Sequence, residues 1–255
     1  MAEARTHDIV AKRLNKSFNG NHVLRELDLE VERGETFVLL GLSGSGKSVF
    51  LKHIAGLIVP DSGTIEVLGS NIHELPPDQL LELRRHVGMV FQSAALFNSM
   101  TVEENVALAL REYNQHTEDD IRDIVNEKLK LVSMTDSHHL LPEEISGGMK
   151  KRVAVARALA LDPKIILFDE PTTGLDPIMS RNVDELILDL KKQVKVTSVV
   201  VSHDLATAFL VGDRVGMIHE GRIIGVGTPD EFRASDNEII RRFIGADIHG
   251  MQKDE

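Results

Sequence analysis

A glycine-rich segment between an apolar strand and a helix constrains this sequence more than any other feature. Residues 36–40, Thr-Phe-Val-Leu-Leu, run directly into the segment Gly41–Ser48, Gly-Leu-Ser-Gly-Ser-Gly-Lys-Ser. A helix-compatible run starts at Val49 and stops at Gly56. A strand, then G-x-x-x-x-G-K-[ST], then a helix is the pattern of a phosphate-binding loop. An ordinary glycine-rich turn with an incidental lysine is the alternative, and both flanking segments count against it.

The residue types in this loop suit a bound triphosphate. Glycines permit a tight turn whose backbone N–H groups face inward, where a polyanion can be held. The helix that starts at the loop adds unpaired N–H groups and the positive end of its dipole. Lys47 supplies a point charge for the β- and γ-phosphates, and the Ser48 hydroxyl is a natural Mg²⁺ ligand. The sequence therefore predicts a nucleoside triphosphate site.

Composition narrows the class of protein. The 255 residues suffice for one large domain or two small ones, and the formal net charge of −11 argues against a nucleic-acid-binding surface. The sequence has no cysteine, which excludes disulfides, thiolate metal sites and cysteine nucleophiles. No signal peptide is visible, and no apolar run approaches the roughly 18–20 residues that span a bilayer. We expect a soluble chain in which any membrane role comes through a partner.

Apolar strands that alternate with helical segments indicate an α/β fold. Residues 36–40, 164–170 and 196–201 are near-continuous apolar runs, which are typical of a parallel sheet covered on both faces. The region 9–40 as a whole predicts short strands, with a hairpin turn at Asn19-Gly20.

Helical signals dominate from Ser93 to about Leu161. Within this region Thr101 and Glu104 have the spacing of a capping box. Further on, two short strands flank a turn at Glu220-Gly221, and Thr228 is the expected N-cap of a C-terminal helix.

Polar residues at strand ends are the candidates for catalysis, because ligands of open α/β sheets bind outside the carboxyl ends of the strands. Asp169 and Glu170 end one apolar strand. We interpret Asp169 as the holder of Mg²⁺ and Glu170 as the residue that polarises the attacking water. Gln92 and His203 follow two other strands, and His203 is a candidate to contact the γ-phosphate. The alternative for the carboxylate pair is that both residues are simply solvated at the surface after the strand. The alternative for His203 is a purely structural role.

A second helix start resembles a phosphate-binding site. Ser146-Gly147-Gly148-Met149 precedes a strong helix-forming run, although the phosphate site of this chain is already built. The alternative is a simple turn in which Ser146 caps the helix. The pair His138-His139 has no third ligand near it in sequence, and we interpret it as part of a solvated loop rather than as a metal site.

Six motifs in this order and spacing resemble the nucleotide-binding domains of ABC transporters, over about Ile9 to Gly245. They are similar to the Walker A, Q-loop, signature, Walker B, D-loop and H-loop motifs, which here are Gly41–Ser48, Gln92, Ser146-Gly147-Gly148, Ile165–Glu170, Gly174-Leu175-Asp176 and His203. The resemblance implies ATP with Mg²⁺, and a head-to-tail homodimer in which each ATP lies between Walker A of one copy and the signature of the other.

The resemblance also implies a set of site residues. Those expected to act in hydrolysis are Glu170, His203 and Gln92, and those expected to hold the metal are Ser48, Gln92 and Asp169. Phe18 is the implied base-stacking aromatic. The other residues expected at the nucleotide are Gly41, Ser43, Gly44, Ser45, Gly46, Lys47, Ser48, Val49, Ser146, Gly147, Gly148 and Asp176.

The implied fold is that of a P-loop NTPase. It is a RecA-like α/β fold with a mainly parallel sheet, an N-terminal antiparallel β arm and an inserted helical subdomain. We expect a single ABC ATPase domain over residues 1–255. The β arm and core would occupy 9–92 and 162–227, the helical subdomain 93–161, and a C-terminal helix and tail 228–255.

One departure from the family pattern is informative. Position 149 is Met where the family signature usually has Gln, and a thioether cannot reproduce the hydrogen bonds of an amide. With Gln92–Phe97 and Gly174–Ile178, this signature resembles the ATPases of lipid transporters of the maintenance-of-lipid-asymmetry (Mla) type, which pair with MCE-domain substrate-binding proteins. The implied partners are a second copy and an integral membrane permease (MlaE-like), at the inner face of the cytoplasmic membrane. Leu96 and Phe97 are candidates for the permease groove, with core packing as the alternative.

Three other functions stay open at this point. A transporter ATPase for another cargo, such as an amino acid or a metal ion, would have the same catalytic residues. A soluble ABC protein that acts on ribosomes or DNA would normally carry two such domains or basic insertions. A nucleotide-responsive regulator without turnover is disfavoured by the presence of both Glu170 and His203.

Overall fold

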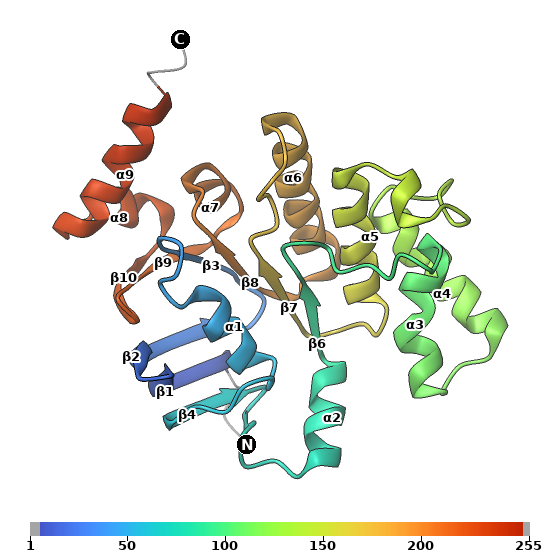
Figure 1. Ribbon diagram of the computed structural model, residues 1–255, viewed down its shortest axis with the longest axis horizontal. Helices are drawn as coiled ribbons and strands as arrows, with labels where there is room; N and C mark the ends of the chain where they lie inside the picture. The colour runs from blue at the N-terminus through green and yellow to red at the C-terminus, as the bar shows by residue number, and fades with distance from the viewer. Residues whose placement is uncertain (1–5, 252–255) are drawn as a thin grey trace. The chain divides into compact units, whose positions relative to one another are not determined.

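The computed structural model describes residues 6–251, and they divide into two units (Figure 1). Unit 1 contains the chain up to Leu80 and from Val199 onward, and unit 2 contains Leu81–Ser198. Two elements cross a boundary between the units along the chain, namely α2 (Pro77–Arg85) and β8 (Thr197–Ser202). Most of the expected tail, residues 252–255, lies outside the described residues.

An antiparallel sheet in unit 1 forms the β arm. Its strand order is β2-β1-β4-β5, and the strands are β1 (His7–Phe18), β2 (Asn21–Glu32), β4 (Ser62–Val67) and β5 (Ser70–Asn71). The Asn19-Gly20 turn is confirmed, and both residues have positive φ, 49° and 80°, as a two-residue hairpin turn requires. The prediction of short strands here is wrong, because β1 and β2 are twelve residues each. Irregular pairing near Arg13 and Glu26, whose φ values are 45° and 46°, lets each strand continue where its alternation breaks.

The second sheet of unit 1 carries the phosphate loop. Within unit 1 the strand order of this sheet is β10-β9-β3-β8, with β3 at Thr36–Leu40, β9 at Arg214–His219 and β10 at Arg222–Gly227. β3 is parallel to β9, in a register that pairs Phe37 with Arg214 and Leu40 with Met217. All five residues of β3 are buried. Helix α1 (Lys47–Ile54) follows β3, and helix α7 (Leu205–Val211) follows β8.

The C-terminal region forms two helices instead of the one that we predicted. Thr228 does cap the first, α8 (Pro229–Arg233), but that helix ends after five residues. The Asn237 side chain then accepts hydrogen bonds from the backbone N–H groups of Ile239 at 2.9 Å and Ile240 at 3.4 Å. An asparagine in this position starts a new helix, and α9 (Glu238–Met251) begins there.

Unit 2 combines a parallel strand pair with helices. β6 (Val87–Val90) runs parallel to β7 (Ile165–Asp169), with Val87 opposite Ile165 and Val90 opposite Phe168. The predicted capping box at Thr101 and Glu104 is confirmed. In Figure 1, helices α3, α4 and α5 lie side by side, and each contacts the other two. The helices of this unit after α2 are α3 (Val102–Tyr113), α4 (Glu118–Leu131), the short 3-10 helix η1 (Pro142–Glu144), α5 (Gly147–Leu159) and α6 (Pro177–Val194).

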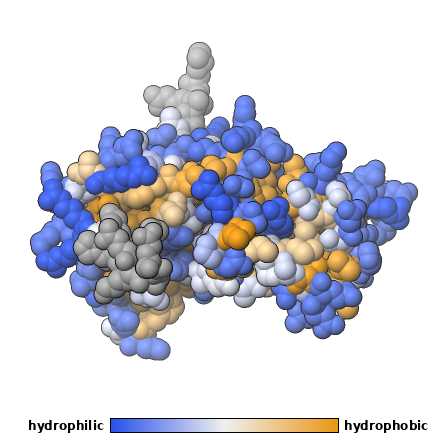
Figure 2. Space-filling view, turned by 90° about the horizontal axis from the view of Figure 1, so that it is seen from above, coloured by the Kyte–Doolittle hydropathy of each residue, from blue (hydrophilic) through white to orange (hydrophobic). Residues whose placement is uncertain are grey.

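Apolar side chains are mostly inside the two units. On the face shown in Figure 2, patches of apolar surface are bordered by hydrophilic side chains. Among residues 6–251, no helix combines the length and the apolar character that crossing a bilayer requires. A few large apolar side chains are exposed nevertheless, among them Leu42, Phe97 and Ile178.

Candidate functional site

The phosphate loop of unit 1 requires glycine at two positions. A Cβ on Gly41 would lie 2.6 Å from the backbone oxygen of Ile218, so that any side chain there would force the loop away from β9. Gly46 has a φ of 108°, and a Cβ on it would lie 2.9 Å from Cδ2 of Leu24. Only glycine satisfies both the conformation and the available space. The loop is therefore fixed by its packing against neighbouring strands before any ligand binds.

Lys47 lies inside this loop. Only 5% of its surface is exposed, and Nζ donates hydrogen bonds to the backbone oxygens of Gly41 at 2.7 Å and Leu42 at 3.2 Å. Both carbonyls belong to the loop itself, so they hold the ammonium group against the loop. A lysine that is buried and oriented in this way supplies a preorganised positive charge for a phosphate. Ser48 and Val49 form the first turn of α1 beside it.

The N-terminus of α1 lacks the side-chain cap that other helices of this chain have. Its N-cap is Gly46, and no side chain accepts a hydrogen bond from its first turn. Among the α-helices of the described residues whose N-cap is defined, the other six are capped by Thr101, Thr117, Ser146, Asp176, Asp204 and Thr228. Because the first N–H groups of a helix need acceptors, an anion is the natural cap for α1.

Two further predicted residues belong to unit 1. Phe18 ends β1 at the hairpin, and its side chain is 42% exposed, with Nζ of Lys16 lying 5.4 Å from the ring centroid. An exposed aromatic face beside a cation is suited to stacking on a base. His203 follows β8 as an exposed residue, and the next residue, Asp204, caps α7. The structure thus places His203 at a strand end, as we predicted.

The two carboxylates lie in unit 2 at the end of β7. Asp169 is the last residue of this fully buried strand, and Glu170 follows with a φ of 49°. The left-handed conformation of Glu170 is unusual for a residue with a side chain, and such conformations concentrate at functional sites. Oε2 of Glu170 accepts a hydrogen bond from the Thr173 hydroxyl at 3.1 Å. Asp169 therefore belongs to the strand, and Glu170 belongs to the turn that follows it.

Ser146 and Asp176 both act as helix caps in unit 2. The Ser146 hydroxyl accepts from the N–H of Met149 at 3.3 Å, and the Asp176 carboxylate accepts from the N–H of Met179 at 2.9 Å. These two helix starts are neighbours, since a Cβ on Gly148 would lie 2.8 Å from Sδ of Met179. The capping role that was the alternative for Ser146 is therefore present, and it leaves the Ser146 side chain at the exposed start of α5.

We did not predict a role for Lys151, a cation that connects the helix after Ser146 with Gln92 and with the carboxylates of Asp169 and Glu170. Lys151 on α5 is 5% exposed, and its Nζ donates a short hydrogen bond to the backbone oxygen of Gln92. Burial lowers the pKa of the Lys151 ammonium group, and the nearby carboxylates of Asp169 and Glu170 oppose this shift. A lysine among the apolar positions of the helix that follows Ser146 was the available signal, because burying a cation is costly without a partner.

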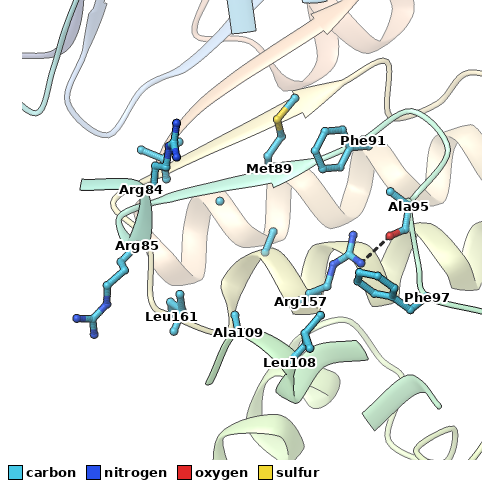
Figure 3. A pocket seen from close by; sticks show the side chains of 13 residues that line it. Arg84, Arg85, Met89, Phe91, Ala95, Phe97, Leu108, Ala109, Arg157 and Leu161 are labelled. Atoms are coloured by element: carbon cyan, nitrogen blue, oxygen red, sulfur yellow. Dashed lines mark hydrogen bonds between the residues drawn. The ribbon is translucent and has the colours of Figure 1, made fainter. Parts of the chain in front are cut away.

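A groove in unit 2 lies beside the segment that contains Gln92. Its volume is about 440 Å³. Apolar side chains from β6, from the loop after β6 and from α3 line it, together with three arginines (Figure 3). Phe97 lines it and is 50% exposed, which supports its prediction as a groove residue, whereas Leu96 is half-buried and does not line it. The residues labelled in Figure 3 are Arg84, Arg85, Met89, Phe91, Ala95, Phe97, Leu108, Ala109, Arg157 and Leu161.

The predicted metal ligands suit Mg²⁺ chemically. Ser48, Gln92 and Asp169 offer hydroxyl, amide and carboxylate oxygens, and oxygen donors are the ones that Mg²⁺ prefers. Within the described residues, no three His, Cys, Asp or Glu side chains gather into a metal-binding group. A Mg²⁺ ion that is bound mainly through substrate phosphates needs only one or two protein carboxylates.

His138, one of the two histidines that we interpreted as part of a solvated loop, does lie near a carboxylate. Its Nδ1 is 3.6 Å from a carboxylate oxygen of Glu103, a residue that is distant from it in the sequence.

Comparison with known proteins decides what these sites belong to. The family model for ABC transporters matches residues 24–173, which include the phosphate loop, Gln92, Ser146 and both carboxylates. The chain belongs to the ABC transporter family. It is 42% identical over 92% of its length to a probable ribonucleotide transport ATP-binding protein, mkl, of Mycobacterium leprae, and it covers 68% of that protein. The chain covers 64% of the length of the Mycobacterium tuberculosis relative, so it spans about two thirds of these mycobacterial proteins.

Other relatives of the family are shorter. The chain is 38% identical, over 91% of its length, to the intermembrane phospholipid transport system ATP-binding protein MlaF of Haemophilus influenzae, and it covers 88% of that protein. Among solved structures, cbiO1 from Clostridium perfringens has a TM-score of 0.84 and 31% identity over 93% of this chain and 94% of that one. The ABC cassette MJ0796, solved as a dimer with ADP and Pi, has a TM-score of 0.79 and 31% identity over 87% of this chain and 98% of that one.

These similarities confirm the predicted α/β fold of an ABC ATPase. The chain binds ATP, and its enzymatic activity is ATP hydrolysis. Lys47, Ser48 and His203 belong to unit 1, whereas Gln92, Ser146, Asp169, Glu170 and Asp176 belong to unit 2. Their individual roles in hydrolysis stay predictions.

Proposed function

We propose that this chain is the ATP-hydrolysing subunit of a membrane transporter that moves phospholipid between membranes. The observation that carries the choice of cargo is the extent of its match to MlaF, of which it covers 88%. The coverage is 68% for the ribonucleotide protein, 66% for an Fe(3+) import protein and 63% for a spermidine/putrescine import protein. A chloroplast relative from Arabidopsis thaliana, TRIGALACTOSYLDIACYLGLYCEROL 3, is 39% identical and is covered to 72%.

In this proposal unit 1 holds the triphosphate. The uncapped start of α1 and the buried ammonium group of Lys47 bind the phosphates, and the exposed ring of Phe18 stacks on the base. Ser48, Asp169 and Gln92 would hold a Mg²⁺ ion, which would supply positive charge to the triphosphate. Glu170 would accept a proton from the attacking water, and His203 would contact the γ-phosphate and orient that water.

The nucleotide site is completed by a second copy of the chain. Ser146 and Gly147 are exposed at the start of α5 in unit 2, whereas the phosphate loop belongs to unit 1. Two large apolar side chains stand exposed beside the two half-sites, Leu42 in the phosphate loop at 58% and Ile178 at the start of α6 at 75%. Exposed apolar side chains at such places are suited to burial in a dimer. The similar cassette MJ0796 was solved as a dimer bound to ADP and Pi, which supports the formation of a dimer.

The groove beside Phe97 is the proposed docking site for a helix of the permease. Its apolar lining fits the apolar face of an amphipathic helix, and Arg84, Arg85 and Arg157 favour acidic residues on that helix (Figure 3). An MCE-domain protein is the expected further component of such a transporter. A different cargo is the second candidate, favoured by the higher identity, 42%, to the ribonucleotide relative.

Purification of the chain with its membrane partner tests the proposal. The tagged chain is extracted in detergent from cells that naturally encode it, and bound proteins and lipids are identified by mass spectrometry. We expect a multi-span membrane protein and phospholipid. Phe97→Asp should remove the membrane protein while ATP binding is kept, and Leu81→Asp is the matched control, since Leu81 is 53% exposed and lies outside the groove. Loss of the partner in both variants, or a complex that binds another solute and no lipid, would contradict the proposal.

A further inference from the structure

The segment from Gln92 to Phe97, the Gln92 loop, contains an unfavourable backbone conformation at two successive residues. Ala94 has a φ of 62° and Ala95 a φ of 48°. Left-handed backbone brings Cβ close to the following carbonyl oxygen, so that residues other than glycine seldom adopt it and rarely do so in succession. Such a conformation persists only where surrounding contacts impose it. The contacts that impose it here can be named.

Arg157 on α5 holds both alanines through their carbonyl groups. Its Nη1 donates to the oxygen of Ala95 at 2.7 Å (Figure 3). Its Nη2 donates to the oxygen of Ala94 at 2.9 Å. A guanidinium group presents its donors in a fixed planar fork, and two adjacent carbonyls turned to one side match that fork. Burial lowers the pKa of the Arg157 guanidinium.

The two ends of the Gln92 loop are also held. At the first end, Nζ of Lys151 donates to the oxygen of Gln92. At the other end, the buried Asn105 on α3 accepts from the N–H of Phe97 at 2.8 Å and donates to the oxygen of Phe97 at 3.1 Å. The loop is thus fixed by side chains from two helices, and both cations come from α5.

Helix α5 therefore carries three functional connections at different points along its length. It begins at the exposed Ser146 cap, it reaches Gln92 through Lys151, and it reaches the wall of the groove through Arg157 and Ala95. A rigid helix with these contacts cannot move without moving the loop, unless the Arg157 hydrogen bonds break.

We propose that Arg157 is a positioning residue that keeps Ala94 and Ala95 left-handed, so that the groove wall, Gln92 and the start of α5 move together. The hydrolysis of ATP then depends on Arg157 through the placement of Gln92, without contact between Arg157 and the nucleotide. That a permease helix in the groove would be coupled to Gln92 rests on the proposed function. The positioning of the Gln92 loop by Arg157 does not depend on it.

The test compares Arg157→Gln with Arg152→Gln. Arg152 is on the same helix and also donates to a backbone oxygen, that of Val132 at 2.9 Å, but it does not contact the Gln92 loop. In Arg157→Gln we expect amide exchange of residues 92–97 to rise about tenfold or more, and kcat to fall about tenfold with the KM for ATP changed less than about twofold. Arg152→Gln should leave both quantities unchanged.

Glycine substitution separates a positioning role from simple loss of structure. Ala94→Gly with Ala95→Gly removes the conformational cost that Arg157 is proposed to balance. Added to Arg157→Gln, this pair should restore most of kcat, whereas a general packing defect would not be repaired by smaller side chains. If Arg157→Gln does not fold, Arg157→Lys replaces it, because one ammonium cannot match two carbonyls as a fork does.

Two results would overturn the inference. One is unchanged exchange of residues 92–97 in the folded Arg157 variant, and the other is a failure of the glycine pair to raise kcat. Both measurements use the chain alone, so they do not depend on a permease. If they come out as expected while no membrane protein binds the groove, the proposed transport function fails and the inference about Arg157 stands.

Discussion

Two helix starts in this chain contain glycine and resemble phosphate-binding sites, yet they are built differently. α1 begins after Gly46 without a side-chain cap, with the buried Lys47 turned onto its own loop. α5 begins after Ser146, whose hydroxyl already accepts from the N–H of Met149. The first start combines a buried lysine with the absence of a side-chain cap, whereas the second start is already capped by the side chain of Ser146.

The difference teaches which of the two sites can bind ATP alone. The loop at α1 is fixed by glycines packed against neighbouring strands, so we expect it to bind a triphosphate without help. The start at α5 already has a side-chain cap, so we expect it to add only a dipole and a hydroxyl to a phosphate that another group holds. This division is what a composite site between two copies requires.

The largest effect is expected at the first helix start, from Lys47→Ala. Loss of one charge-assisted contact of about 1.5–3 kcal/mol should weaken ATP affinity roughly 10- to 150-fold. Titration calorimetry with ATP measures it. Lys52→Ala on the same helix is the control, because Lys52 is exposed. The ATP affinity of this variant should match that of the parent chain. Equal losses in the two variants would show that the loop lysine has no special role.

A second comparison concerns the glycines of the two starts. Gly46→Ala forces a Cβ to within 2.9 Å of Leu24 at a φ of 108°, and backbone strain of this kind costs about 1–3 kcal/mol. Gly147→Ala meets only Leu175 at 3.5 Å, an ordinary contact. We expect Gly46→Ala to lower ATP affinity about tenfold, while Gly147→Ala leaves it unchanged. Titration of both variants with a fluorescent nucleotide measures the two affinities. If Gly147→Ala weakened binding more than Gly46→Ala, the assignment of the α1 start as the main phosphate site would be wrong.

Removal of a helix cap gives a smaller effect that separates stability from function. Ser146→Ala and Thr117→Ala each delete an N-cap in unit 2, and each should lower the free energy of unfolding by about 1 kcal/mol. Only Ser146→Ala should also slow ATP hydrolysis, because Thr117 caps a helix without a proposed ligand. Chemical denaturation and phosphate release measure the two quantities. If Thr117→Ala slows hydrolysis as much, the effect of Ser146 is structural alone.

Acid pH should loosen α1 more than α5. His53 on α1 is fully buried and its ring lies 6.2 Å from that of His73, and burial lowers the pKa of both groups. Folded pKa values below the ordinary 6.5 mean that the unfolded chain binds more protons, so stability is complete above about pH 6.5 and falls below it. Lys16 also disfavours protonation of His53, and Asp61 and the bond to Val49 favour it.

Amide exchange measures this pH dependence, with intrinsic rates corrected between pH 7.5 and 5.5. Peptides from α1 should lose protection at the lower pH while those from α5 keep theirs. His53→Leu should remove most of the difference. Equal loss of protection in both helices, or an unchanged pH dependence in His53→Leu, would contradict the role of the histidine pair.

The sequence was informative where function depends on residue type and spacing. The phosphate loop, the strand-end carboxylates and the Thr101 capping box follow from local patterns, and the structure has each of them. The break between α8 and α9 was missed because the cap at Asn237 resembled an ordinary polar residue within a helix. The Arg157 contacts were not predictable, since left-handed φ values at two alanines have no signal in sequence.

Mixing of two complementary variants tests most directly whether ATP is held between two copies. Both carry Glu170→Gln to slow hydrolysis. One adds Lys47→Ala, which disables the phosphate loop, and the other adds Ser146→Arg, which blocks the start of α5. Light scattering with ATP measures the mass. We expect each variant alone to stay monomeric and the mixture to form ATP-dependent dimers, because one intact loop then faces one intact Ser146. A mixture that stays as monomeric as its components, while the Glu170→Gln parent dimerises with ATP, would contradict a site shared between copies.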